Sequence, residues 1–308
     1  MLMSTGRKIA IVTGAFGFAG AGVTENLLSK GYRVYAVCRE GSVHNDRFEE
    51  SSFLKKILLN MDEYDRIHEY VEADDIKGAD HILFFHLSWG GGRDDFETQY
   101  ANVEASLKAM DSVAALDCKV RFIGIGSQAE YGVCQNVITE DTPLVPFTAY
   151  GSCKAAAYHL LKSKARILGV DFVWGRIFSL IGKYEPSGRM LPDLCRKLLA
   201  GQEVNLSSCE QYWDYLDVTD AAEAIVLLGE KGKNGESYNI ASGDYRRLSE
   251  FVESAAKVLS ADKNFIHYGV KADPFVSLQP SVDKLKRDTG FVPKISFEKS
   301  LRNSFIDI

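Results

Sequence analysis

Residues 9–20 read Ile-Ala-Ile-Val-Thr-Gly-Ala-Phe-Gly-Phe-Ala-Gly, an apolar run that ends on the glycines Gly14, Gly17 and Gly20. Glycine tolerates positive φ, and its missing Cβ lets the backbone approach a pyrophosphate closely. An anion at such a turn also meets the free N–H groups of the helix that follows. An isolated glycine triplet can equally be an ordinary turn. The strand-like run before it and the amphipathic stretch after it favour a dinucleotide-binding turn.

Short apolar runs alternate with amphipathic stretches outward from this turn. We predict strands over 8–13, 33–38, 55–59, 81–86, 120–126 and 171–177. We predict helices over 18–30, 63–74, 97–116 and 150–168. Strands separated by helices indicate an α/β fold with a doubly wound parallel sheet, in which ligands bind at the carboxyl ends of the strands.

The pattern changes after about residue 178, where Gly182, Pro186, Gly188 and Pro192 interrupt the chain. Helices are expected over 190–200, 219–231 and 247–259. We therefore predict a dinucleotide-binding domain over 1–178 and a smaller substrate-binding lobe over 179–308. The segment 212–245 is expected to return to the first domain, because 238–240 reads as a buried strand.

Composition narrows the classes of function. The chain of 308 residues is 46% hydrophobic and 25% charged, which suits a globular core. A net charge of −6 argues against nucleic-acid binding. The six cysteines form no Cys-x-x-Cys pair and the six histidines show no ligand spacing, so we predict no metal site. No signal peptide and no apolar run of about 20 residues is visible, which predicts a cytoplasmic protein without a membrane span.

The end of the second predicted strand bears on the choice of dinucleotide. An acidic residue there would bind the ribose hydroxyls of NAD and repel a 2′-phosphate, but this chain has Cys38 followed by Arg39. A guanidinium can pair bidentately with a phosphate. We therefore expect NADP(H), with NAD(H) and a merely solvated Arg39 as the alternative. Asp62 is a candidate acceptor for the adenine amino group.

Tyr150 and Lys154 stand at i and i+4 on a predicted helix, so their side chains share one face. A neighbouring ammonium favours the phenolate and lowers the pKa of a tyrosine, which makes it a better acid–base group. Lys154 would also bond the nicotinamide ribose, and Ser127, at the end of a strand, would hold the substrate oxygen. Alone, these residues would be an exposed helical pair and a strand cap. Their order after the glycine turn indicates a catalytic set.

Together these motifs resemble the extended short-chain dehydrogenase/reductase family, in its NAD-dependent epimerase/dehydratase branch acting on nucleotide sugars. Three further segments support the resemblance, namely 102–106 (Asn-Val-Glu-Ala-Ser), 176–179 (Arg-Ile-Phe-Ser) and 213–218 (Trp-Asp-Tyr-Leu-Asp-Val). The resemblance implies a Rossmann domain, an NAD(P) site and a homodimer built through helices 97–116 and 150–168. The implied cofactor-binding residues are Gly14, Gly17, Phe18, Ala19, Gly20, Arg39, Asp62, Leu87, Asn102, Tyr150 and Lys154.

The chain departs from the family pattern beside the catalytic serine. Family 4,6-dehydratases carry an Asp-Glu pair directly after this position, and those carboxylates drive the elimination of water. Here the two residues are Gln128 and Ala129, which argues against a dehydratase.

Departures also occur where the family holds the nucleotide diphosphate. Ser179 and Arg189 each replace an expected asparagine, and Trp213 replaces an expected arginine. Trp213 would stack on a base or sugar, or else pack between the lobes. The expected substrate-binding residues are Ser88, Gln128, Ser179, Arg189, Met190 and Trp213. Three glycines in the segment 89–93 suggest a mobile loop from which Arg93 reaches an anionic substrate, or a plain surface turn.

Three functions follow as hypotheses. The first is an NADP(H)-dependent reductase of a nucleotide-linked 4-keto-6-deoxy sugar, with Tyr150 as the proton donor. The second is a nucleotide-sugar 4-epimerase that keeps NAD tightly bound. The third is a non-catalytic NAD(P)-binding scaffold or sensor, against which the intact set Ser127, Tyr150 and Lys154 argues.

Overall fold

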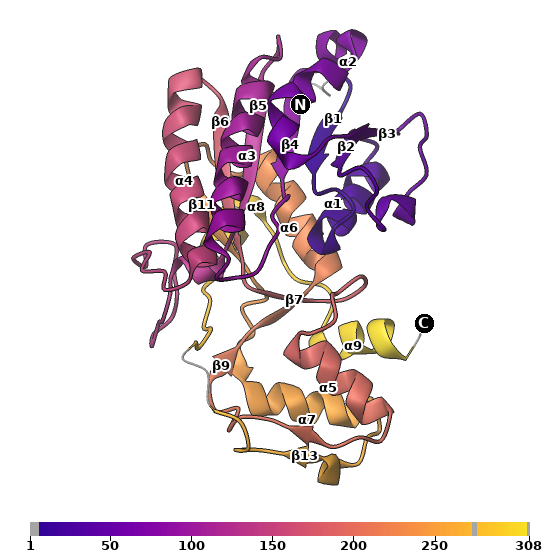
Figure 1. Cartoon of the computed structure of the whole chain (residues 1–308), viewed down its shortest axis with the longest axis vertical. Coiled ribbons are helices and arrows are strands. Elements are labelled where there is room, and N and C mark those ends of the chain that lie inside the picture. Colours follow the sequence, from indigo (N-terminus) through magenta and orange to yellow (C-terminus); the bar gives the residue numbers. More distant parts are fainter. Residues whose placement is uncertain (1–5, 273–275, 307–308) are drawn as a thin grey trace.

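A seven-stranded sheet forms the centre of the larger part of the molecule, in the order β11-β6-β5-β4-β1-β2-β3 (Figure 1). The computed structural model describes residues 6–272 and 276–306. All neighbouring strands of this sheet run parallel. They are β1 (Ile9–Thr13), β2 (Arg33–Cys38), β3 (Leu54–Leu58), β4 (Ile82–His86), β5 (Val120–Ser127), β6 (Asp171–Ile177) and β11 (Ser237–Ile240). The predicted doubly wound α/β fold is confirmed.

Helices cover both faces of the sheet, which explains why the central strands are apolar throughout rather than alternating. Every residue of β1 and β4 is buried. One face packs against α1 (Phe18–Ser29) and α6 (Val218–Lys231), and its core includes Val23 and Ile225. The other face packs against α3 (Phe96–Ala114) and α4 (Ala149–Leu168), with Met110 and Leu161 in its core.

One predicted helix is wrong in type and extent. In place of a helix over 63–74, the chain forms a 3₁₀ segment η2 (Met61–Tyr70) and a short helix α2 (Ala73–Gly78). A capping box between Asn60 and Glu63 starts the segment earlier than expected. Val71 is extended, with φ −82° and ψ 125°, so the helical path is broken before residue 74.

The smaller lobe lies below the sheet in Figure 1 and has its own core between three helices, α5 (Met190–Leu199), α7 (Leu248–Val258) and α9 (Phe297–Phe305). Its short strands are β7 (Ser179–Ile181), β8 (Val204–Asn205), β9 (Tyr212–Trp213), β10 (Tyr215–Asp217), β12 (Arg246–Arg247) and β13 (Ile266–His267). The remaining elements are η1 (Asn45–Arg47), η3 (Gln128–Glu130), η4 (Lys263–Phe265) and α8 (Asp283–Thr289).

Several elements beyond residue 178 complete the larger part. Strand β11 pairs with β6, α6 packs against the sheet, and Leu285 of α8 joins the same core. Strand β9 lies within the segment 212–245 and β12 directly follows it. These two strands nevertheless pair with each other in the smaller lobe. The division of the chain at residue 178 stays a prediction.

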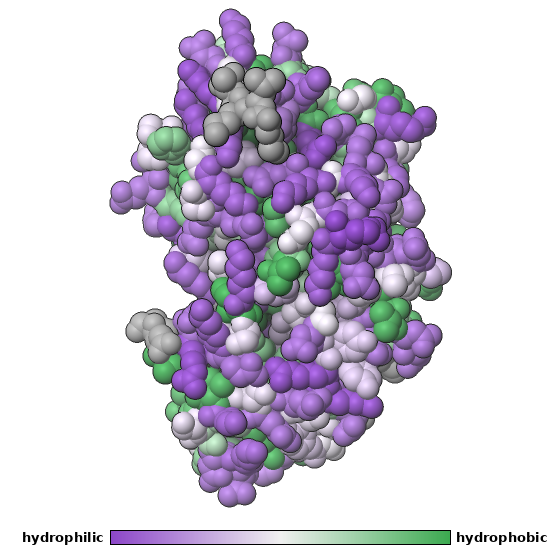
Figure 2. Space-filling model, turned by 180° about the vertical axis from the view of Figure 1, so that it is seen from behind, coloured by the Kyte–Doolittle hydropathy of each residue, from purple (hydrophilic) through white to green (hydrophobic). Residues whose placement is uncertain are grey.

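The surface is mainly polar on the face seen from behind, where hydrophobic residues form small separate groups (Figure 2). Among residues 6–272 and 276–306, no helix has both the length and the apolar character needed to cross a bilayer.

Candidate active site

The glycine turn between β1 and α1 has the geometry that a pyrophosphate requires. Gly14 has φ +64°, and a Cβ there would lie 2.9 Å from the backbone of Ser88. A Cβ on Gly20 would fall on the carbonyl oxygen of Gly14, so only glycine lets the helix start this close to the strand. Helix α1 begins after Gly17 without a side-chain cap or an acidic residue in its first turn. The predicted positions Phe18 and Ala19 lie in that turn, where backbone N–H groups favour an anion.

Cationic side chains gather near the end of β2. Arg39 is exposed just after the buried Cys38. Burial, Arg47 and Arg39 together lower the pKa of His44, which places both guanidiniums near this imidazole. Arg47 donates a hydrogen bond of 2.5 Å to the Phe16 carbonyl in the glycine turn.

Lys56 adds a further cation from β3. Its Nζ donates to the Asn45 carbonyl at 2.8 Å and lies 5.7 Å from the Phe16 ring centroid. The sequence predicts Arg39 alone, because Arg47 is brought to the glycine turn by the path of the chain between β2 and β3, and Lys56 by the pairing of these two strands. Asp62 is exposed at the start of η2, and its carbonyl accepts a hydrogen bond from Lys108 at 2.6 Å.

The end of β4 lies beside the glycine turn. The His86 ring is held by the hydroxyls of Thr13 at 2.9 Å and Ser106 at 2.8 Å. Burial, with a smaller contribution from Lys154, lowers the pKa of His86 to about 3, so this imidazole is neutral at physiological pH. Leu87 and Ser88 follow, half-buried, and the Ser88 hydroxyl accepts a hydrogen bond from the Tyr64 phenol at 2.9 Å.

Asn102 on α3 holds the loop that follows β4. Its side chain accepts from the Gly90 N–H and donates to the Gly90 carbonyl, both at 3.0 Å. Gln99, one turn earlier, donates to the carbonyls of Gly90 at 3.1 Å and Gly92 at 2.9 Å. A Cβ on Gly91, with φ +87°, would run into Thr98. Gly91 thus permits close packing of the loop on α3, and a cofactor contact by Asn102 stays a prediction.

Ser127 and Tyr150 meet at the carboxyl edge of the sheet. Ser127 ends β5, and Thr148 caps α4 so that Tyr150 lies in the first helical turn. Burial raises the pKa of the Tyr150 phenol, and a hydrogen bond with the Ser127 side chain opposes that rise. The Ser127 oxygen accepts the Ala129 N–H at 3.2 Å, which leaves its O–H to donate to the phenol or to a substrate oxygen.

Lys154 lies one turn further along α4 and is only 4% exposed. Its Nζ donates to the Ile125 carbonyl at 2.6 Å. Burial lowers the pKa of this ammonium to about 7, against the opposing effect of the Glu130 carboxylate. The charge of Lys154 is therefore sensitive to small changes around it near neutral pH.

Glu130 is fully buried and is not among the site residues predicted from the sequence. Its Oε1 accepts the Ser127 N–H at 2.8 Å, and its Oε2 accepts Arg176 Nε at 2.7 Å. The Trp174 indole N–H lies 3.2 Å from both oxygens. The pattern Ser-x-x-Glu over 127–130 is a capping box and was the available signal. Glu130 thereby fixes the position of Ser127 and places a negative charge close to Tyr150 and Lys154.

The expected substrate residues come from several elements of the chain. Gln128 follows Ser127 directly, and Ser179 starts β7. The Arg93 guanidinium lies 5.4 Å from the centroid of the Tyr150 ring, and Arg93 and Arg189 both act to lower the pKa of Tyr150.

Two expected substrate residues lie further into the smaller lobe. Met190, at the start of α5, is 36% exposed. Trp213 packs against the apolar cores that contain Phe251 and Tyr131, and its indole N–H is buried without a hydrogen-bond partner among the described residues. A stacking role for Trp213 stays a prediction.

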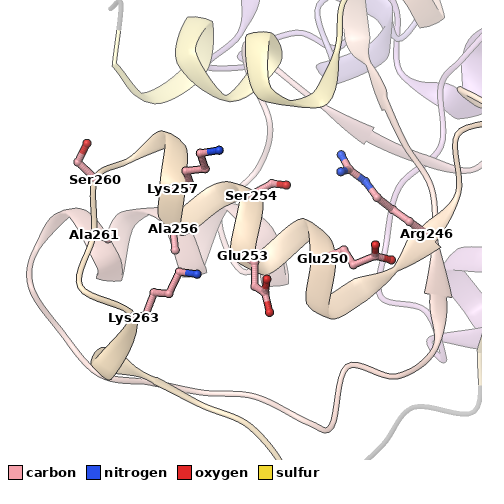
Figure 3. Close-up of a pocket in the computed structure, with 9 residues that line it drawn as sticks. All are labelled: Arg246, Glu250, Glu253, Ser254, Ala256, Lys257, Ser260, Ala261 and Lys263. Carbon is pink, nitrogen blue, oxygen red and sulfur yellow. The ribbon is translucent and has the colours of Figure 1, made fainter.

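A separate hollow lies at the far side of the smaller lobe. Figure 3 shows that its lining comes from Arg246, helix α7 and the segment that follows, with Glu253, Lys257 and Lys263 among the residues. Its charges are of both signs, and none of Ser127, Tyr150 or Lys154 lines it. The chemistry is therefore assigned to the edge of the sheet and not to this hollow.

A comparison with known families finds a match that spans most of the chain. The sequence model of the NAD dependent epimerase/dehydratase family matches residues 10–241. A dTDP-glucose 4,6-dehydratase of Haemophilus influenzae is 26% identical over 200 residues, which cover 60% of this chain and 59% of that protein. The chain thus matches about three fifths of the length of this relative.

Solved structures share the fold over nearly the whole chain. The dTDP-glucose 4,6-dehydratase of Bacillus anthracis in complex with NAD has a TM-score of 0.81 and 20% identity, covering 97% of this chain and 95% of the other. RMD of Pseudomonas aeruginosa complexed with NADPH has a TM-score of 0.77 and 21% identity, covering 96% and 97%.

Proposed function

The chain belongs to the NAD dependent epimerase/dehydratase family, and on that premise we propose that it reduces a nucleotide-linked 4-keto-6-deoxy sugar with NADPH. The observation that carries the proposal is the pairing of Ser127 with a half-buried Tyr150 whose pKa is raised, with Gln128 and Ala129 beside Ser127. A protonated phenol is the state that a reduction consumes. The absence of carboxylates at 128 and 129 argues against an elimination of water.

Each residue of the set has a distinct task in this proposal. Bound NADPH would supply hydride to the carbonyl carbon. Tyr150 donates its proton to the carbonyl oxygen, and the Ser127 hydroxyl donates a hydrogen bond to the same oxygen. Lys154, charged, stabilises the phenolate that remains after the transfer.

The reaction type is tested with a panel of nucleotide sugars followed at the nicotinamide absorbance, with products separated by chromatography. We expect a 4-keto-6-deoxy nucleotide sugar to consume one equivalent of NADPH and give a single 4-hydroxy epimer. Interconversion of two 4-hydroxy sugars without net use of cofactor would refute the reductase and favour a 4-epimerase. The absence of any reaction across the panel would also refute this reductase, and would favour a substrate without the usual diphosphate.

The cofactor proposal is NADP(H) over NAD(H), supported by the cationic groups of Arg39, Arg47 and Lys56 around the end of β2. The structure of RMD complexed with NADPH also supports it, as a fold neighbour. A charge-assisted pair with a phosphate is worth about 1.5–3 kcal/mol, so Arg39→Ala should weaken NADPH binding about 10- to 100-fold and leave NADH binding unchanged. Arg47→Ala should act in the same direction.

Dissociation constants measured by nicotinamide fluorescence test this selectivity. Arg302→Ala is a matched control, because Arg302 is exposed on α9, in the smaller lobe. Equal affinities for NADPH and NADH in the unaltered protein would contradict the assignment.

We also propose a homodimer formed through α3 and α4. These neighbouring helices are tied by an ion pair of 2.6 Å between Lys164 and Asp111. They expose large apolar side chains, including Tyr100 at 52%, Leu160 at 47% and Ile167 at 73%. Apolar surface of this kind is typical of protein interfaces. Sedimentation equilibrium should give twice the chain mass, and a monomer at micromolar concentration would contradict the proposal.

A further inference from the structure

The Trp89 indole lies directly over the Lys154 ammonium. The distance from Lys154 Nζ to the centroid of the Trp89 ring is 3.7 Å, well inside the range of a cation–π contact. The same indole meets the Tyr150 ring edge-on, with centroids 6.4 Å apart. One side chain outside the predicted catalytic set therefore touches two of its members.

The position of Trp89 is fixed by its own hydrogen bonds. Its indole N–H donates to the Gln99 Oε1 at 2.6 Å. The Gln99 amide in turn donates to the carbonyls of Gly90 and Gly92, so ring and loop are held on α3 as one unit. An indole anchored at its N–H cannot turn its face away from Lys154 without losing that bond.

Few other groups stabilise the charge on Lys154. The Ile125 carbonyl of β5 accepts its proton at 2.6 Å, and Glu130 of η3 is the carboxylate that supports its charge. His86 of β4 is neutral, and the Arg93 guanidinium lies over the Tyr150 ring, 5.4 Å from its centroid. No direct ion pair to Lys154 is formed within residues 6–272 and 276–306. A desolvated ammonium in such surroundings gains more from an aromatic face than an exposed one does.

We propose that Trp89 is a positioning residue for Lys154, whose indole face keeps the ammonium charged and directed along the Tyr150 side of the site. The inference rests on the proposed role of Lys154 in the catalytic set. A purely structural Trp89 would support the loop and leave the proton affinity of Lys154 unchanged. The two roles therefore differ in a quantity that can be measured without substrate.

The test is the pKa of Lys154 in the full chain, followed by NMR of ¹³C-labelled lysine side chains, with Lys154→Arg to assign the signal. A desolvated cation–π contact corresponds to about one pH unit. Trp89→Leu should lower the pKa of Lys154 by about that amount, and Trp89→Phe by less because a benzene ring binds cations more weakly. Phe265→Leu is the control, since Phe265 packs against the core of the smaller lobe.

An unchanged pKa of Lys154 in both Trp89 variants would overturn the proposal. An equal fall in Phe265→Leu would also overturn it, because the effect would then come from general loosening of the fold. The Trp89→Phe variant keeps an aromatic ring at this position and keeps the test available where Trp89→Leu does not fold. The measurement uses neither cofactor nor sugar, so its result is independent of the reaction assigned to the site.

With a verified substrate, the same charge predicts a second readout. Activity that needs the Lys154 ammonium is lost as pH rises through its pKa, because the neutral amine no longer stabilises the phenolate. The alkaline limb of kcat/KM should move to lower pH in Trp89→Leu by the shift seen in NMR. An unmoved limb together with a shifted NMR pKa would mean that the Lys154 ammonium does not set this limb, and would overturn the positioning role of Trp89 in turnover.

Discussion

Replacing Tyr150 with phenylalanine should lower turnover by about 10²- to 10⁴-fold, the usual contribution of a positioned general acid. The phenol acts on the transition state, so affinity for NADPH should remain close to that of the unaltered protein. The ring would keep its place, because Tyr150 is held by its backbone N–H, which donates to the Arg93 carbonyl at 2.8 Å. Single-turnover rates and cofactor titration separate the two effects.

Tyr268→Phe is the matched control for this substitution. Tyr268 is 41% exposed in the smaller lobe, and losing its hydroxyl should leave turnover unchanged. Should Tyr150→Phe retain most of its activity with a verified substrate, the proton would come from another group, and the exposed Arg93 and Arg189 could not replace it because guanidinium stays charged.

The larger part of the fold was predictable because its signals are local. Strands such as β1 and β4 are continuous apolar runs of the length that a buried parallel strand needs. The helices α1, α3 and α4 show their period over several turns. The segment 61–78 was predicted less well, since the early capping by Asn60 and the extended Val71 depend on how this crossover packs under β3 and β4.

The proximity of Ser127, Tyr150 and Lys154 was predictable for the same reason. Tyr150 and Lys154 are one turn apart on a helix, and parallel strands bring Ser127 to the edge of the sheet where α4 begins. The positions of Trp89 and Arg47 could not be predicted from the sequence. Each residue lies on a loop whose path is set by tertiary hydrogen bonds, such as that of Trp89 with Gln99. No spacing in the sequence encodes those paths.

Glu130 is a different case, because its local signal was present and its tertiary consequence was not. A capping box explains why its carboxylate turns back to the Ser127 N–H. Nothing in the segment 127–132 announces that Arg176, on the next strand of the sheet, completes a buried ion pair with it. The sequence-based prediction considered only Gln128 and Ala129, neither of which carries a carboxylate. The buried carboxylate belongs to the next residue, Glu130.

Glu130→Gln should lower the free energy of unfolding by about 3–5 kcal/mol, the cost of leaving one partner of a buried ion pair uncompensated. An amide oxygen can still accept the Ser127 N–H, but its NH₂ group would face the Arg176 guanidinium and the Trp174 indole N–H, all of them donors.

Urea unfolding measures this loss, and Glu140→Gln provides the comparison. The Glu140 carboxylate accepts the Asn239 N–H at 2.8 Å, an interaction that a glutamine oxygen preserves, so its loss should be below about 1 kcal/mol. Similar losses in the two variants would mean that the Glu130–Arg176 pair contributes no more than a single hydrogen bond. A much larger loss at Glu130 would mean that its ion pair with Arg176 stabilises the carboxyl ends of β5 and β6. The same carboxylate accepts the Ser127 N–H, so the stability of the sheet and the position of Ser127 would then depend on one side chain.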